Sequence, residues 1–252
     1  MPAGTMMRAA MLLVCLGLEA GVAADDPDAP LAEFHMARLI YDSGRNERAW
    51  RSWWAIDYPE AEYHLMRGLA RLTSLDVADD SIHLRLTDDD IFDHPWLFAQ
   101  QVGQWHLSDA EILRLREFVR RGGFLVVDDF HGRFEWPIMS AVMQRAFPEW
   151  PIEPLPEDHD LMTVLYDLDQ STQIPGRRHL YRGAGGQVEA QLRGPAEWYG
   201  ISDDSGRLVV AINFNMDMGD AWEHADDPAY PLPMTSLAYR FAVNYVIYAM
   251  TH

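Results

Sequence analysis

The stretch GGFLVVDDFHG, residues 122–132, decides the fold. After two glycines it runs through four apolar residues to Asp128 and Asp129, which stand side by side before an aromatic residue, a histidine and a glycine. An unbroken apolar run is typical of a strand that is covered on both faces, as in a parallel sheet. Ligands bind beyond the carboxyl ends of such strands, so the two carboxylates are predicted to lie where a site forms.

The segment before this strand, residues 108–121, has the clearest helix pattern in the chain. Ser108 followed by Glu111 predicts a capping box, in which the two residues satisfy each other's backbone N–H groups at the start of the helix. Apolar residues then recur at helical spacing as far as Val119. The helix is therefore expected to lay one apolar face on the sheet.

The same alternation of strand and helix patterns continues along the chain. Strands are predicted over residues 34–41, 81–86 and 207–215, with a further short apolar run over 94–101. Helices are predicted over 59–73 and 133–147, and an amphipathic helix over 235–250. Strands that alternate with helices indicate a mainly parallel sheet with helices on both faces. We therefore expect a single α/β domain over residues 33–252, doubly wound in the flavodoxin-like manner.

The first 24 residues have a different character. Arg8 precedes an apolar segment over residues 9–18, and Val22 and Ala24 stand at the spacing that signal peptidase prefers. This pattern predicts a signal peptide over 1–24, a linker over 25–32 and an exported, periplasmic protein with no stable membrane span after cleavage. The alternative is an uncleaved anchor helix, which the short apolar segment disfavours because a bilayer span needs about 20 residues.

The composition excludes several kinds of chemistry. Cys15 is the only cysteine, so the chain after cleavage would have neither a disulfide nor a thiolate site. All 20 basic residues are arginine, which excludes a Walker A loop and a Schiff-base lysine. The 39 acidic residues give a formal net charge of −19, which repels phosphate backbones. A nucleic-acid partner is therefore not expected.

Several stretches, taken in order, resemble one bacterial family. They are ARLIYD (37–42), WWAIDYP (53–59), LSDAEILRLREFVRRGGFLVVDDF (107–130), AFPEWPIEPLPEDHDL (146–161), NFNMDMGDAWE (213–223) and AVNYVIYAM (242–250). Together they look like the family called domain of unknown function 4159, over about residues 33–250. The resemblance implies a class I glutamine amidotransferase-like fold, and it implies no particular activity.

The turn after the central strand separates this chain from amidotransferases. Those enzymes carry a cysteine, and related hydrolases a serine, on a glycine-flanked turn at this place. The corresponding turn here reads VVDDFHG, and neither G-x-S-x-G nor G-x-C-x-G occurs in the chain. The glutaminase mechanism is therefore not carried over from the resemblance.

Polar residues follow the predicted strands and fill one acidic loop. Asp128, Asp129 and His131 follow the central strand, His159 lies in the loop PEDHD, and Asp217 follows the strand of residues 207–215. In a doubly wound sheet these groups are expected to converge on one edge, where ligands bind. The predicted ligand-binding residues are Arg38, Tyr41, Asp128, Asp129, His159 and Asp217.

Asp128, Asp129 and His159 are the predicted metal ligands. Carboxylates with an imidazole suit Mg²⁺, Mn²⁺, Ca²⁺ or Zn²⁺, so the expected cofactor is a divalent metal ion or none. Two close carboxylates could instead share a proton and act as acid and base. Each residue also has a structural alternative, because an aspartate at a strand end often caps a helix and a histidine often bonds the backbone.

Three functions of different classes follow from these features. The first is an exported, non-catalytic domain that binds a small molecule or an envelope protein, favoured by the missing nucleophile. The second is a metal- or carboxylate-dependent hydrolase of the cell envelope that acts on a saccharide, favoured by the acids and by Trp50, Trp53 and Trp54, whose rings could stack on sugars or pack over the sheet. The third, which the resemblance alone implies, is an assembly component beside membrane-linked ATPase and von Willebrand-type proteins.

Overall fold

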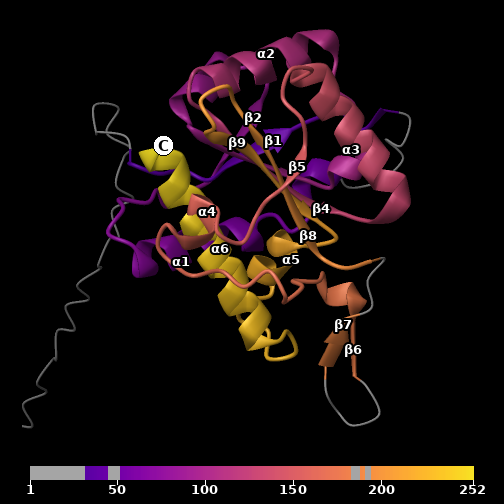
Figure 1. Ribbon diagram of the computed structural model, residues 1–252. Coiled ribbons are helices and arrows are strands. Elements are labelled where there is room, and N and C mark those ends of the chain that lie inside the picture. Colours follow the sequence, from indigo (N-terminus) through magenta and orange to yellow (C-terminus); the bar gives the residue numbers. More distant parts are fainter. Residues whose placement is uncertain (1–31, 45–51, 183–187, 191–193) are drawn as a thin grey trace, which may run out of the picture. The chain divides into compact units, whose positions relative to one another are not determined.

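The computed structural model describes residues 32–44, 52–182, 188–190 and 194–252, and residues 32–252 form one compact unit. The predicted signal peptide and nearly all of the predicted linker lie outside the described residues. The unit is an α/β domain built on a seven-stranded sheet (Figure 1). Its strand order is β2-β1-β3-β4-β9-β8-β5, which confirms the predicted α/β class.

Five parallel strands form the main part of the sheet. They are β1 (Ala37–Ile40), β2 (Ile82–Arg85), β3 (Trp96–Gln100), β4 (Phe124–Phe130) and β9 (Leu208–Phe214). β4 and β9 lie side by side, with Leu125 opposite Val210 and Val127 opposite Ile212. The apolar residues of both strands are buried, except for the partly buried Phe214 at the end of β9, as their apolar patterns predict.

Two antiparallel strands extend the sheet beyond β9, so the sheet is mixed. β8 (Glu197–Ser202) runs antiparallel to β9, and β5 (Glu153–Pro154) runs antiparallel to β8. A separate two-stranded ribbon is formed by β6 (Leu180–Arg182) and β7 (Val188–Ala190). The sequence patterns predict none of these four strands.

Helices cover both faces of the sheet. One face carries α2 (Asp109–Arg120) and α3 (Gly132–Ala146), and the other carries α1 (Glu60–Leu72), α4 (Asp160–Thr163), α5 (Met218–Glu223) and α6 (Leu232–Thr251). Short 3-10 turns lie at η2 (Trp53–Ala55), η3 (Asp89–Asp93), η4 (Val102–Gln104) and η5 (Arg177–His179). Successive residues of β4 enter opposite layers, because Phe124 packs in the layer of α6 and Leu125 in the layer of α2.

The capping box predicted for α2 is present. The Ser108 hydroxyl accepts a hydrogen bond from the Glu111 N–H at 3.3 Å, and the Glu111 carboxylate accepts one from the Ser108 N–H at 2.8 Å. Two N–H groups that the helix leaves without partners are thereby satisfied. This cap fixes where α2 begins and therefore how its apolar face meets the sheet.

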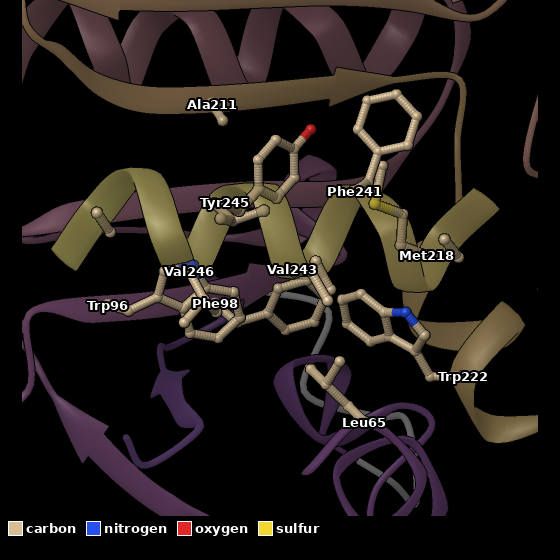
Figure 2. Close-up of a cluster of buried hydrophobic side chains, with 14 of the residues drawn as sticks. Leu65, Trp96, Phe98, Ala211, Met218, Trp222, Phe241, Val243, Tyr245 and Val246 are labelled. Atoms are coloured by element: carbon tan, nitrogen blue, oxygen red, sulfur yellow. The ribbon is translucent and has the colours of Figure 1, made fainter. Parts of the chain in front are cut away.

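α6 is a helix as predicted, but its predicted amphipathic character is wrong. Eleven of its 20 residues are buried, because the sheet lies on one side and α1, α4 and α5 pack around it. Figure 2 shows Phe241 and Tyr245 directed from α6 toward the strand that carries Ala211. The ring centroid of Tyr245 lies 6.3 Å from that of Phe124. α6 is therefore a core element of this layer.

Candidate functional site

Four non-glycine residues with positive φ angles mark the carboxyl edge of the sheet. In the part of the chain that the structure describes they are the only such residues: Asp57 (64°), Gln101 (54°), Asp129 (50°) and Asn215 (58°). Three of them lie at the ends of β3, β4 and β9, and Asp57 accepts a hydrogen bond from Gln100 at the end of β3. Such conformations cost about 1–3 kcal/mol each and tend to gather at functional sites.

Asp128 joins β4 to the start of α5. Its buried carboxylate accepts hydrogen bonds from the N–H groups of Met218 (2.7 Å) and Gly219 (3.2 Å) and from Asn213 Nδ2 (3.1 Å). Burial, and then the neighbouring Asp129, raise the pKa of Asp128 to about 7. Both carboxylate oxygens have protein partners, so the contacts of Asp128 agree with the capping alternative.

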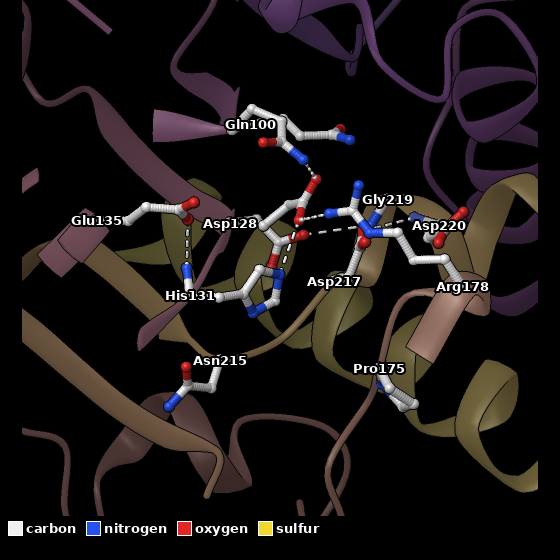
Figure 3. A network of polar contacts seen from close by, with 12 residues as sticks. Gln100, Asp128, His131, Glu135, Pro175, Arg178, Asn215, Asp217, Gly219 and Asp220 are labelled. Atoms are coloured by element: carbon white, nitrogen blue, oxygen red, sulfur yellow. Dashed lines mark hydrogen bonds and ion pairs between the residues drawn. The ribbon is translucent and has the colours of Figure 1, made fainter. Parts of the chain in front are cut away.

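Asp129 is the central residue of the candidate site, where the side chains of His131, Asp217 and Arg178 come together in Figure 3. Gln101 Nε2 donates a hydrogen bond to its Oδ2, and His131 Nε2 lies 2.9 Å from its Oδ1. The largely exposed Arg178 guanidinium reaches to 4.0 Å from the same Oδ1. The end of β4 therefore places a carboxylate and an imidazole in contact, and both residues are buried.

Asp217 reaches the same cluster from the side of α5. It is 3% exposed, and as the N-cap of α5 its Oδ1 accepts a hydrogen bond from the Asp220 N–H at 3.0 Å. Burial, and then the charge of Asp129, raise the pKa of Asp217 well above its ordinary value. Gly176 permits this approach, since a Cβ there would lie only 2.5 Å from Asp217 Oδ2.

Asp129, His131 and Asp217 form a group that could hold a metal ion. One ligand atom from each lies within 4.8 Å of the others, and all three residues are buried. Two carboxylates and an imidazole are suitable ligands for a divalent cation. His131 Nδ1 is buried and has no hydrogen-bond partner among the described residues, so this ring keeps an unused nitrogen.

A second group of possible metal ligands lies next to the first, on α5. Asp220, Glu223 and His224 meet the same distance condition but are only partly buried. Burial, as the largest cause, raises the pKa of Asp220 to about 7. Its carboxylate also accepts a hydrogen bond from the Arg177 N–H at 2.6 Å. The buried group is the stronger candidate, because water competes less for its ligand atoms.

Arg38 and Tyr41 are buried beside the end of β3, where they contact Gln100 and Gln101, and neither lines an open crevice. Arg38 is fully buried, pairs with Glu62 and donates to Gln100 Oε1 at 2.9 Å. The Tyr41 hydroxyl lies 2.7 Å from the carbonyl oxygen of Gln100 and 2.9 Å from that of Gln101. The two predicted residues therefore position Gln100 and Gln101, which in turn contact Asp57 and Asp129.

The structure does not bring His159 to Asp128 and Asp129, which corrects their expected grouping. His159 is the N-cap of α4, where its Nδ1 accepts a hydrogen bond from the Leu161 N–H at 3.0 Å. Its ring centroid lies 5.8 Å from that of Tyr248, whose hydroxyl accepts from the N–H of Leu208 at the start of β9. His159 therefore belongs to the amino edge of the sheet, and the imidazole beside Asp129 is that of His131.

Trp53 and Trp54 pack over the edge of the sheet. Both are partly buried against the layer of α2 and α3, and the ring centroid of Trp54 lies 5.3 Å from that of His83. Trp50 lies outside the described residues. For Trp53 and Trp54 the contacts agree with the packing alternative and not with stacking on a sugar.

The sequence also decides the family of the chain. It matches the family model described as Domain of unknown function (DUF4159) over residues 35–250. The chain belongs to this family. A comparison with curated proteins finds no match. Within the described ranges of this DUF4159 protein, no helix is both long enough and apolar enough to cross a membrane.

The site of this DUF4159 domain differs from a nucleophile elbow in its chemistry but shares its position. In an elbow, a serine or cysteine occupies a strained turn between a central strand and a helix. Here Asp129, with a φ angle of 50°, precedes α3 by three residues, and His131 lies between them. The turn therefore places a buried carboxylate and a buried imidazole where an elbow would present a nucleophilic oxygen or sulfur.

Proposed function

We propose that this protein is a non-catalytic ligand-binding domain whose site is organised by a divalent cation held by Asp129, His131 and Asp217. The observation that carries the proposal is the convergence of these three buried residues, one ligand atom of each lying within 4.8 Å of the others. Such a cation would leave coordination positions for a polar ligand. The proposed ligand is a small molecule or a group on an envelope protein.

The charge around the three residues supports the proposal. Asp57, Asp128 and Asp220 add further carboxyl groups to the cluster, and burial raises the pKa of each. The Arg38 guanidinium is already paired with Glu62, and Arg178 is 61% exposed. Two carboxylates 4 Å apart repel by about 4 kcal/mol at an effective dielectric constant of 20. A bound divalent cation would offset this repulsion.

The test is metal binding by the purified protein. We expect elemental analysis to find one divalent cation per chain, and Mn²⁺, Zn²⁺, Mg²⁺ or Ca²⁺ to raise the melting temperature above its value in EDTA at equal ionic strength. A ligand at about 100 times its Kd stabilises the folded state by about 2.7 kcal/mol, which is a shift of roughly 5–10 °C for a domain of this size. His131→Asn should abolish both effects.

His159→Asn is the matched control. It removes a partly buried imidazole at the amino edge of the sheet but keeps a side chain that can cap α4. We expect this variant to bind the cation like the wild type. Equal cation responses in the wild type and in His131→Asn, or no response to any of the four cations, would overturn the proposal.

The second candidate function is a carboxylate-dependent hydrolase of the cell envelope. The observation in its favour is the strained turn at Asp129, whose Oδ1 lies 2.9 Å from His131 Nε2. A carboxylate can act as a nucleophile when a second group activates water for the later step. Hydrolysis of ester or glycoside substrates that Asp129→Asn abolishes would favour the hydrolase over the binding domain.

We also propose a specific topology for the parallel part of the sheet. Counted along the chain, the five parallel strands stand in the order 2-1-3-4-5, which is the flavodoxin-like order. We therefore assign the parallel part of the sheet to that arrangement, with an antiparallel extension of β8 and β5. A crystal structure with a left-handed crossover between any two of these strands would contradict this assignment.

We further propose that the protein is exported to the periplasm and cleaved after Ala24. The support is the sequence pattern of residues 1–24, with its short apolar segment and the small residues at 22 and 24. Mass spectrometry of protein from the envelope fraction should find Asp25 at the amino terminus. Full-length protein in the cytosol would contradict export. The assembly role stays a prediction of the sequence resemblance.

A further inference from the structure

A cavity of about 380 Å³ lies between α1 and the first turns of α6, on the face of the sheet opposite α2 and α3. α1 contributes His64, Arg67 and Arg71, and α6 contributes Thr235 and Ser236. The cavity shares no residue with the candidate cation site. The two sites are therefore built from separate residues.

The α1 side of the cavity is basic. His64, Arg67 and Arg71 are spaced by three and four residues, so they share one face of the helix. Neither arginine forms an ion pair with a carboxylate of the described residues, although the chain has 39 acidic residues and 20 arginines. The Arg67 guanidinium lies over the ring of Tyr63, at 5.2 Å from its centroid. Two neighbouring arginines without acidic partners leave a local positive charge that a ligand anion would balance.

The α6 side of the cavity supplies hydroxyl groups. Thr235 is only 5% exposed and lines the cavity, and its hydroxyl has no hydrogen-bond partner among the described residues. Ser236 lines the cavity beside it. A threonine hydroxyl that lines a cavity and donates to no protein group can hydrogen-bond a ligand there. The positive end of the dipole of α6, a helix of 20 residues, lies at the same place and also favours an anion.

We propose that this cavity binds a phosphate group through Arg67, Arg71 and the Thr235 hydroxyl. Guanidinium groups donate paired hydrogen bonds that match the geometry of phosphate oxygens, and a threonine hydroxyl can donate a further one. Asp226, which is exposed at the rim and lies 3.8 Å from His64 Nε2, sets a limit on affinity because it repels the same anion.

The rim of the cavity indicates that the phosphate belongs to a larger molecule. Leu72 and Leu232 line the cavity and are 45% and 72% exposed, so both can contact an apolar group attached to the phosphate. This chemistry is shared by soluble phosphate monoesters and by the headgroups of anionic phospholipids. Inorganic phosphate and phospholipid vesicles, tested separately, distinguish the two sources.

Calorimetric titration of the purified protein with inorganic phosphate at low ionic strength tests the site. We expect a single site with a millimolar Kd, weakened about tenfold or more in Arg71→Gln and in Arg67→Gln. Thr235→Val, which keeps the shape of the side chain, should weaken binding by a smaller factor. Arg133→Gln is the matched control, because Arg133 stacks on Phe134 at 4.8 Å as Arg67 does on Tyr63 but lies outside the cavity.

Cosedimentation with phosphatidylglycerol vesicles identifies the source of the phosphate group. Binding to vesicles that Arg71→Gln abolishes assigns the site to lipid headgroups, whereas phosphate binding without vesicle binding assigns it to soluble phosphate esters. No phosphate binding, or phosphate binding that survives in the Arg67→Gln, Arg71→Gln double variant, would overturn the proposal. Neither result depends on the cation site.

Discussion

Asn215 shows how one residue fixes the geometry of the candidate site. Its φ angle is 58°, and its side chain accepts a hydrogen bond from the Gly132 N–H at 2.9 Å and donates one to the Pro195 carbonyl at 2.8 Å. Asparagine adopts this conformation more readily than most residues because its short side chain bonds nearby backbone groups. The first bond holds the end of β9 against the start of α3 and so fixes the turn that carries Asp129, and the second ties the end of β9 to the segment before β8.

Asn215→Ala should lower the free energy of unfolding by about 2–4 kcal/mol. The variant loses two hydrogen bonds and must keep a left-handed backbone that alanine disfavours. Asn215→Gly loses the same bonds without the conformational cost, so we expect it to be less destabilised by about 1 kcal/mol. Urea unfolding of the three proteins measures both differences. A glycine variant less stable than the alanine variant would show that the positive φ angle carries no strain.

The position of each residue relative to the strand ends explains which site residues the sequence predicts. Asp129 and Asp217 are predictable because each follows an apolar strand, and parallel strands bring their carboxyl ends to one edge. Gln100 and Gln101 end the apolar run of β3 in the same way, so the signal was present for them too. His159 lies in a loop that is far along the chain from the carboxyl end of any parallel strand. No local sequence pattern indicates to which edge of the sheet such a loop returns.

At the scale of elements, the Asp128 carboxylate at the end of β4 caps the start of α5, an interaction that we call the latch. α5 has only six residues, too few to be stable by their own hydrogen bonds. The N–H groups of Met218 and Gly219, which have no partners within the helix, donate to the Asp128 carboxylate instead. The latch places Asp217, the residue before α5, beside Asp129.

Asp128→Asn should release this latch. An amide has one acceptor, so either orientation of the new side chain sets its NH₂ group against a donor on α5 or against the Asn213 amide. We expect a loss of about 1–3 kcal/mol in the free energy of unfolding. Hydrogen exchange at Met218 and Gly219 should also become faster. Asp169→Asn, in an exposed turn, is the control with little expected effect. Unchanged exchange at Met218 would contradict the latch.

The type and burial of each element decide whether its sequence pattern predicts it. The strands that are covered on both faces and the long helices were predictable, because an unbroken apolar run or a helical repeat is imposed by burial itself. β8 lies nearer the edge of the sheet and is buried only in part, so EWYGIS mixes polar and apolar residues. β5 has two residues and α5 six, which is too short for any periodicity to appear.

At the scale of the whole molecule, the dominant feature is a group of acidic side chains buried in the interior. The chain has a formal charge of −19, and most of its acids are solvated, but four carboxyl groups at the carboxyl edge have raised pKa values. They belong to Asp57, Asp128, Asp217 and Asp220. A fold that keeps such groups together is stable at neutral pH only when protons or a cation neutralise part of the charge.

Asp57 allows the effect of this charge to be measured. Burial raises its pKa most, followed by the charges of Asp220, Asp129 and Glu223, while Arg38 lowers it. The folded state therefore holds a proton that the unfolded state, with a pKa of about 3.9, releases. Stability from this proton is fully present below about pH 4 and is lost as the pH rises toward the folded pKa.

Asp57→Asn removes the titrating group but keeps the size of the side chain and its tolerance of a positive φ angle. The free energy of unfolding of the variant minus that of the wild type should therefore increase with pH above about 4, by at most about 1.4 kcal/mol per pH unit. Burial lowers the pKa of His83, His94 and His159, which gives stability the opposite pH dependence, but these contributions cancel in the difference. Urea unfolding of both proteins in EDTA, from about pH 5 to pH 8, supplies the values. Saturation with the divalent cation should flatten the difference, because the cation takes over the neutralisation that the proton provides. A difference that is constant or falls with pH would show that Asp57 is ionised in the folded protein without cost.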